Sequence, residues 1–525
     1  MFAVLLTTAG GPKDRSSSQE TTTKGSSKVE QVFTVAVGSE IGDLNPHNYK
    51  SSFPALDLVY EPLVRYAPDG TLKPALAKSW KISDDGKTWT FQLREGVTFH
   101  DGTPFDAIAA KWNLERWVGG KDHDWLPTAT YVKSIEAKDK YTLVLRMKAP
   151  YYGALQELAL VRPVRFLSPK AADAAGKFLK PVGTGPWQVQ QDNSTQRAVF
   201  VPYKNYWGTK PKLDEVVFDV IPDSQTRVAA LLSGQATLIG GEYIGGIPLE
   251  SIPTLENDPK VKLLTAQGST TYLIQTNYRR PPFNDDRVRQ ALNYAIDRAA
   301  ISSKVFNGLA TPAKGVFAPG IPYVTYLEQQ LYAYNPNQAK TLLTNAGWKP
   351  GNEGILEKNG QRFLITMVVD GDMFPQAKSM AEVVQAELRN IGIAMDIRLL
   401  DSGGWTNAIE KNDFDLTINM TQGPPYDPHS SLTQMFHSIK QSNEHGGFNA
   451  DPKLDKMIAQ VLTTKDEKQR QQRYAQIQKY IDENAAAIPV VYSQRIYALS
   501  NNVDKFKLAG TEYELNLEGV TFKGR

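Results

Sequence analysis

Beyond residue 30, segments with strand-like and helix-like apolar spacing alternate along the chain. Residues 31–37 (QVFTVAV) are rich in β-branched and aromatic side chains, which favours a strand. Residues 80–99 predict a hairpin, because the Asp-Gly pair at 85–86 stands between two stretches of alternating polarity. In residues 286–301 the apolar side chains recur at helical spacing, which predicts a helix with a core-facing stripe.

The other predicted elements continue this alternation. We expect helices at 105–117, 224–232, 337–346, 376–391 and about 465–483. We expect strands at 132–137, 141–147, 213–221, 271–277, 363–369, 394–400, 415–420 and 488–492. Helices and strands that alternate in this way predict an α/β fold with mixed sheets.

The length of the chain predicts more than one lobe, since 525 residues exceed what a single hydrophobic core usually serves. Lobe I is expected at 31–266 plus 493–525, with an inserted subdomain at about 65–180, and lobe II at 267–492. Ligand sites in such arrangements tend to lie in the cleft between domains.

Composition and motifs argue against several classes of function. The net charge is only +3 and basic residues are scattered, so a nucleic-acid surface is not indicated. The absence of cysteine excludes disulfides, thiolate metal sites and cysteine nucleophiles. A metallohydrolase or serine hydrolase remains the enzyme alternative, but HExxH and GxSxG motifs are missing.

The N-terminal tract, residues 1–30, has the form of an export signal remnant followed by a tether. Residues 1–11 (MFAVLLTTAGG) are apolar and end in small residues, and residues 12–28 are polar. The junction resembles that of a lipoprotein, with Gly11 where the lipid-bearing cysteine is expected. The alternative is a plain disordered N-terminus. No later stretch approaches the roughly 20 apolar residues of a membrane span.

Several motifs resemble those of the bacterial peptide and nickel class of extracytoplasmic solute-binding proteins. The most specific is the stretch LVYEPLVRYAPDGTLKPALAKSWKISDDGKTWTFQLREGVTFHDGTPFDA at 58–107, and GTGPW (183–187) and VRQALNYAIDR (288–298) match as well. The resemblance covers the chain from about residue 31 to its end. It implies a two-lobed periplasmic-binding-protein-like fold with a hinge, and no enzymatic activity.

Within that class the chain is most similar to the nickel-binding members. The shared segments are LNPHNY (44–49), ELALVRPVRF (157–166), VGTGPWQV (182–189) and PPYDPH (424–429). The resemblance implies a nickel or related metal chelate, such as nickel–histidine, passed to an ABC importer by hinge closure. The alternatives are an oligopeptide-binding protein and a metallophore-metal binding protein.

The same resemblance implies the setting of the protein. Its partners would be the permease and ATPase subunits of the importer and a small-molecule metal chelate, with no nucleic acid and no intrinsic cofactor. We expect a monomer outside the cytoplasm, as a cell-surface lipoprotein or in the periplasm, that contacts the membrane only through a lipid anchor.

Four residues are candidates for holding the chelate. The planar guanidinium of Arg162 suits a chelator carboxylate, because it pairs carboxylate oxygens in a bidentate manner. By resemblance Trp125 lies in the cleft, and Tyr426 and Tyr49 are expected to cover the ligand. The alternatives are an inter-strand ion pair for Arg162 and core packing for Trp125.

The metal-contacting histidine of the nickel members has no direct match. Lys440 stands at the aligned position, so His437 or His445 would have to supply the imidazole after a loop shift. Asp122 and Gln422 stand where nickel members carry arginine and tryptophan, which leaves the identity of the chelator open. By resemblance His429 lies in a structural turn.

Overall fold

The computed structural model describes residues 30–67, 70–193, 195–324, 331–371, 373, 375–438 and 451–524. Residues 1–29 of the expected tether, together with Lys440 and His445, lie outside the described residues. None of the helices in the described ranges is long and apolar enough to cross a membrane.

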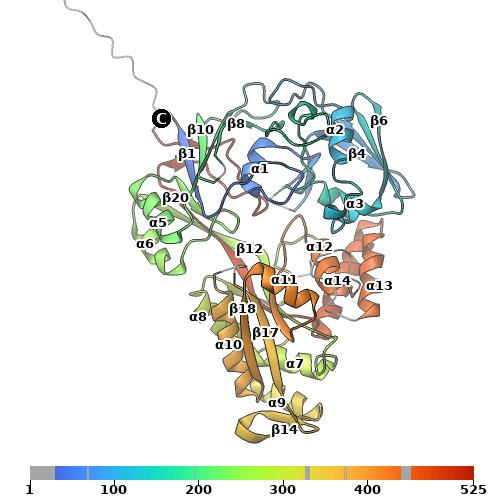
Figure 1. The fold of residues 1–525 in the computed structure, drawn as a ribbon, viewed down its shortest axis with the longest axis vertical. Helices are drawn as coiled ribbons and strands as arrows, with labels where there is room; N and C mark the ends of the chain where they lie inside the picture. The colour runs from blue at the N-terminus through green and yellow to red at the C-terminus, as the bar shows by residue number, and fades with distance from the viewer. Residues whose placement is uncertain are drawn as a thin grey trace, which may run out of the picture.

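The chain forms two α/β lobes, drawn one above the other in Figure 1. An 11-stranded sheet runs through both, in the order β18-β17-β19-β12-β20-β11-β1-β10-β9-β8, with β13 paired to β20. The sheet is mixed, because β1 (Val32–Val37) pairs in parallel with β10 (Glu215–Val220), and β9 (Arg197–Pro202) pairs with β10 in the antiparallel sense. The predicted α/β class with mixed sheets is confirmed.

The upper lobe carries a second, four-stranded antiparallel sheet in the order β4-β5-β7-β6. The predicted hairpin is β4 and β5, and Gly86 in its turn adopts a left-handed φ of 68°, which glycine accepts without strain. Besides β1, β9 and β10, this lobe contains β2 (Val64–Tyr66), β3 (Leu72–Pro74), β4 (Ala77–Ile82), β5 (Thr88–Leu93), β6 (Val132–Asp139), β7 (Thr142–Met147), β8 (Trp187–Asn193), β11 (Leu238–Gly240), α1 (Phe53–Val59), α2 (Ala107–Leu114), α3 (Pro127–Tyr131), α4 (Ala154–Glu157), α5 (Ser224–Ser233) and α6 (Ile252–Asn257).

Helices cover the lower part of the sheet, and three further helices lie beside it beneath α3 (Figure 1). Apolar residues of α13 and α14, such as Ile458 and Ile477, belong to the same buried cluster as the core of the upper lobe, so these helices join the lobes. The elements are α7 (Asp286–Ala295), α8 (Arg298–Val305), β13 (Thr311–Pro312), α9 (Pro336–Asn345), β17 (Leu364–Asp370), α10 (Ala377–Asn390), β18 (Ala394–Leu400), α11 (Ser402–Glu410), β19 (Leu416–Met420), α12 (His429–Ser431), α13 (Pro452–Leu462) and α14 (Glu467–Glu483).

The expectation of one helix over 286–301 is wrong, because the segment forms α7 and α8 with a break between them. Ile296 is extended, at φ −91° and ψ 117°. Asp297 then caps α8 by accepting a hydrogen bond from the Ala300 backbone N–H at 2.9 Å. The apolar spacing continues across the break, so the pattern alone did not reveal it.

Two long strands connect the lobes, and both exceed their predicted lengths. β12 (Val261–Thr276) and β20 (Ile488–Ser500) pair antiparallel along most of their course. Their register shifts between Gln267 and Thr271, where the strands pass from one lobe to the other. At Gly268 a Cβ atom would lie 2.7 Å from the backbone oxygen of Ser493, so the close approach of the two backbones there requires glycine.

Candidate ligand-binding site

The structure brings four of the predicted site residues into one group, which we call the Arg162 cluster: Tyr49, Trp125, Arg162 and Tyr426. The indole Nε1 of Trp125 donates to Tyr49 Oη at 2.8 Å, and the ring of Trp125 stacks on Tyr426 with centroids 6.0 Å apart. A guanidinium nitrogen of Arg162 donates to the backbone oxygen of Tyr49 at 2.7 Å. Because Tyr426 follows β19 of the lower lobe, the cluster spans the two lobes.

Loops position all four side chains. Tyr49 lies between β1 and α1, and Trp125 lies between a 3-10 turn (Lys121–His123) and α3. Arg162 follows α4, and Tyr426 lies between β19 and α12. Loops held by a rigid scaffold are where binding residues concentrate.

Arg162 is a largely buried cation without a carboxylate partner. Among the described residues, no Asp or Glu oxygen lies within 4.0 Å of its guanidinium, and its Nε is buried without a hydrogen-bond acceptor. The guanidinium instead lies 3.7 Å from the centroid of the Phe53 ring and donates to the Ser51 backbone oxygen at 2.8 Å. Burial lowers the pKa of Arg162, an effect that the surrounding tyrosines partly offset. A buried charge of this kind is costly unless an anion pairs with it.

Two tyrosines that the sequence analysis missed extend the aromatic wall. The rings of Tyr243 and Tyr513 lie 4.4 Å apart, and Tyr513 is 5.3 Å from Tyr426 and 4.8 Å from Phe53. Tyr243 Oη donates to Tyr513 Oη at 3.0 Å, which in turn donates to the Gln422 backbone oxygen at 2.5 Å. These residues lie far from Arg162 in sequence, and no local motif marks them.

Two hydrogen bonds hold the hydroxyl of Tyr49. Trp125 Nε1 donates to Tyr49 Oη, and the same hydroxyl is hydrogen-bonded to His123 Nδ1 at 2.7 Å. In a neutral His123 with its proton on Nε2, Nδ1 accepts this bond from the hydroxyl. Burial lowers the pKa of His123, which favours this neutral form. The sequence analysis did not single out His123, although it stands two residues before Trp125.

The predicted metal-binding histidines are not joined to a metal-binding group in the described part of the chain. His437 is buried, and its Nδ1 lies 3.8 Å from an oxygen of Asp455 in α13. That carboxylate also accepts from the backbone N–H of Ser438 at 2.8 Å. No set of three or more His, Cys, Asp or Glu side chains among the described residues could hold a metal ion. The role of His437 therefore stays a prediction, as does that of His445.

Three further residues singled out in the sequence lie near the cluster in the chain: Gln422 and Asp122, which differ from the nickel members, and His429. Gln422 donates from its amide to Gln434 Oε1 at 2.5 Å. Asp122 stands on the 3-10 turn before Trp125. His429 Nε2 lies 3.6 Å from Glu157 Oε1, inside the protein.

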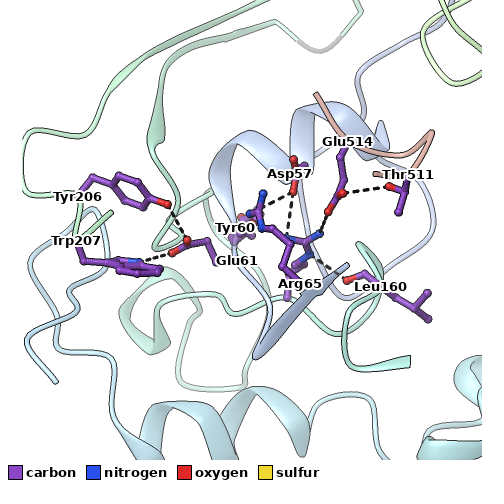
Figure 2. A network of polar contacts seen from close by, with 10 residues as sticks. Asp57, Tyr60, Glu61, Arg65, Leu160, Tyr206, Trp207, Thr511 and Glu514 are labelled. Atoms are coloured by element: carbon purple, nitrogen blue, oxygen red, sulfur yellow. Dashed lines mark hydrogen bonds and ion pairs between the residues drawn. The ribbon is translucent and has the colours of Figure 1, made fainter. Parts of the chain in front are cut away.

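A second arginine in the same segment has the opposite environment. Arg165 is fully buried and its guanidinium nitrogens lie 3.1 Å from Asp57 and 3.2 Å from Glu514. Figure 2 shows the polar network around these two carboxylates. Arg165 also donates to the backbone oxygens of Leu160 and Tyr60. Arg165 therefore forms ion pairs inside the fold, whereas Arg162 forms none with the described residues.

Two α/β lobes joined by crossing strands, with a buried cation in an aromatic wall between them, define a ligand-binding protein of the two-lobed periplasmic type. Residues 71–443 match the model of the bacterial extracellular solute-binding proteins, family 5 middle, and the chain belongs to this family of ABC-transporter binding proteins, which are not enzymes. The match confirms the family expected from the sequence motifs.

The relatives include binders of different ligands. The chain is 38% identical over 499 residues to the nickel-binding periplasmic protein of Escherichia coli K12, with 93% of this chain and 94% of that protein covered. It is 30% identical over 488 residues to the glutathione-binding protein GsiB of Shigella flexneri, with 90% and 91% covered. The crystal structure of NikA from Brucella suis in complex with Fe(III)-EDTA superposes with a TM-score of 0.88 at 33% identity, covering 94% of this chain and 100% of that one.

Proposed function

We propose that this protein captures a carboxylate-bearing chelate of nickel or a related divalent metal and delivers it to the permease and ATPase subunits of an ABC importer. The observation that carries the proposal is Arg162, a buried guanidinium with no carboxylate partner among the described residues. Its free N–H groups match the oxygens of a chelator carboxylate, and the rings of Trp125 and Tyr426 offer flat walls to a planar chelate.

The chelator supplies most of the metal ligands in this proposal. The described residues offer no cluster of three metal-binding side chains, so bare Ni²⁺ is a poor cargo for the Arg162 cluster. A chelate such as nickel–histidine brings nitrogen and oxygen donors that nickel favours, together with a carboxylate for Arg162. His437 or His445 would add at most one further ligand.

Isothermal titration of metal-free protein with three ligands tests this function. We expect nickel with L-histidine to bind, Ni²⁺ alone to bind much more weakly, and glutathione to compete poorly. Binding of glutathione without any binding of nickel–histidine would favour the peptide-binding alternative, which the GsiB relative supports.

We also infer that the lobes close on the ligand about the register shift in β12 and β20. The support is geometric: β12 and β20 run through both halves of the sheet, and the Trp125–Tyr426 stack crosses between the lobes. A ligand that contacts both sides favours the closed form by its differential affinity. Small-angle scattering should show a smaller radius of gyration on adding nickel–histidine, and an unchanged radius would contradict closure.

The location we propose is extracytoplasmic, either in the periplasm or as a monomer tethered to the membrane by a lipid anchor. The polar tract at 12–28 supports a tether, whereas Gly11 stands where the lipid-bearing cysteine is expected. Mass spectrometry of the N-terminus of protein extracted from its native membranes distinguishes the two locations. An N-terminus without lipid would contradict the lipid anchor and favour the periplasm.

A further inference from the structure

A cavity of about 640 Å³ lies apart from the Arg162 cluster, and no member of that cluster lines it. Residues of the upper lobe, such as Trp89 and Tyr152, form one side, and His429 and Arg470 of the lower part form another. The loop that carries Tyr426 separates the two places, because its next residues, 427–429, line the cavity while Tyr426 stacks on Trp125. Its volume is within the range of pockets that hold small organic ligands.

Arg470 gives the cavity a positive charge that no carboxylate neutralises directly. Among the described residues, no Asp or Glu oxygen lies within 4.0 Å of its guanidinium. The guanidinium lies between two rings, 5.3 Å from the centroid of Tyr323 and 5.8 Å from that of Tyr152. It donates to the Thr464 backbone oxygen at 3.0 Å and to Tyr323 Oη at 3.2 Å, which fixes its orientation.

The charges nearest Arg470 are engaged elsewhere. Lys465 is exposed and pairs with Asp84 at 3.1 Å. Glu467 accepts from Tyr323 Oη at 3.2 Å and is exposed to solvent. Asp427 accepts from the Gly423 backbone N–H at 2.7 Å and from Ser431. An anion in the cavity would therefore meet Arg470 as its principal cation.

The cavity lining also contains buried polar atoms without partners. Trp89 is only 1% exposed, and its Nε1 donates no hydrogen bond to any described residue. The side-chain oxygen of Gln156 is likewise buried and unpaired. Unpaired buried donors and acceptors are costly, so these two groups favour a ligand with both an acceptor and an amide-like donor.

We propose that this cavity is a second ligand site, which takes an organic carboxylate with an amide and an apolar or aromatic body. The carboxylate pairs with Arg470, the body packs against the rings of Tyr152, Tyr323 and Tyr474, and the amide reaches Trp89 and Gln156. Because both lobes line the cavity, its occupancy also favours their closed arrangement. The site is independent of the nickel-chelate function proposed for the Arg162 cluster.

The test uses N-acetyl-L-phenylalanine, with its C-terminal amide as the matched probe that lacks the carboxylate. In metal-free buffer, isothermal titration of the full chain should show binding of the acid and about tenfold weaker binding of the amide. Arg470→Gln should weaken binding of the acid by about tenfold and leave that of the amide unchanged. The control is Arg473→Gln, since Arg473 stands on the same helix but does not line the cavity.

Two further measurements place the probe in the molecule. The indole N–H resonance of Trp89, assigned with Trp89→Phe in protein labelled at tryptophan nitrogen, should shift on adding the acid, and on adding the C-terminal amide only at about tenfold higher concentration. Arg162→Gln should keep the binding of the acid. The proposal is overturned if the acid does not bind, if Arg162→Gln abolishes its binding while Arg470→Gln retains it, or if the Trp89 resonance does not move.

Discussion

Arg162 and Arg165 stand three residues apart in one segment, and their surroundings differ in every respect that matters for function. Arg165 contacts the carboxylates of Asp57 and Glu514 and donates to backbone oxygens. Arg162 faces rings and two backbone oxygens, with no carboxylate among the described residues. Arg165 is paired inside the fold, whereas the role we propose for Arg162 is to bind a ligand anion.

The difference shows that burial of a charge does not by itself identify a binding residue. Both arginines have a lowered pKa because burial removes solvating water from the guanidinium. What separates them is whether the fold brings a carboxylate to the same place. Substitution should therefore separate them too, with Arg165 affecting stability and Arg162 affecting binding.

The largest effect is expected for Arg165→Gln. It removes the nearest cation from the buried carboxylates of Asp57 and Glu514 and leaves Asp57 only Arg65, at 3.7 Å, so the free energy of unfolding should fall by about 3–5 kcal/mol. Urea denaturation measures this. Arg146→Gln is the control, because its pair with Glu136 is exposed and should contribute about 0–1 kcal/mol. Equal losses in both variants would remove the distinction.

For Arg162→Gln we expect a loss of ligand affinity without a loss of stability. Affinity for nickel–histidine should fall by about 2–5 kcal/mol, because the ligand carboxylate loses its charged partner in a desolvated place. Stability to urea should be unchanged or increased, since an unpaired buried charge is removed. Arg162→Lys should recover only part of the affinity, because lysine lacks the planar fork. Loss of stability as large as that of Arg165→Gln would show that Arg162 is structural.

The pH dependence of stability should report on His47, which contacts the backbone of Arg165. Burial, followed by the charge of Arg116, lowers the pKa of His47 to about 3, and His47 Nε2 lies 3.1 Å from the Arg165 backbone oxygen. A depressed folded-state pKa gives stability that is present above the unfolded value of 6.5 and is lost as pH falls towards 3.

Between pH 7 and pH 5 this histidine should therefore cost about 2 kcal/mol of stability, measured by urea denaturation at each pH. His47→Gln should reduce the slope of that part of the profile, and the buried His100, whose pKa burial lowers to about 4, should account for part of the slope that is left. The same slope in the variant would assign the pH dependence to other groups.

The smallest effect is expected for Tyr49→Phe. It removes the hydroxyl that links Trp125 Nε1 to His123 Nδ1, so the indole that stacks on Tyr426 is held less firmly. Affinity for nickel–histidine should fall by about 1 kcal/mol, close to fivefold. Stability should hardly change, because Tyr49 is 37% exposed. An unaltered affinity would show that the hydroxyl does not position the cluster.

Local chemistry made much of the fold predictable. The Asp-Gly turn of β4 and β5 could be predicted because it depends on a few adjacent residues. The break between α7 and α8 could not be predicted in this way, because the apolar spacing continues through it. Capping by Asp297 is favoured there over continuation of the helix, and the apolar pattern does not show this. The full lengths of β12 and β20 could not be predicted either, because each strand is extended by its pairing with the other.

The sequence by itself determined the alternation of elements, the family and the four members of the Arg162 cluster, because short motifs and residue types carry that information. The tertiary structure alone decided which arginine of the segment is neutralised and which is not. The carboxylates of Asp57 and Glu514 lie far from Arg165 in sequence, as do Tyr243 and Tyr513 from Arg162. Charge pairing acts through space, so chain order could not reveal it.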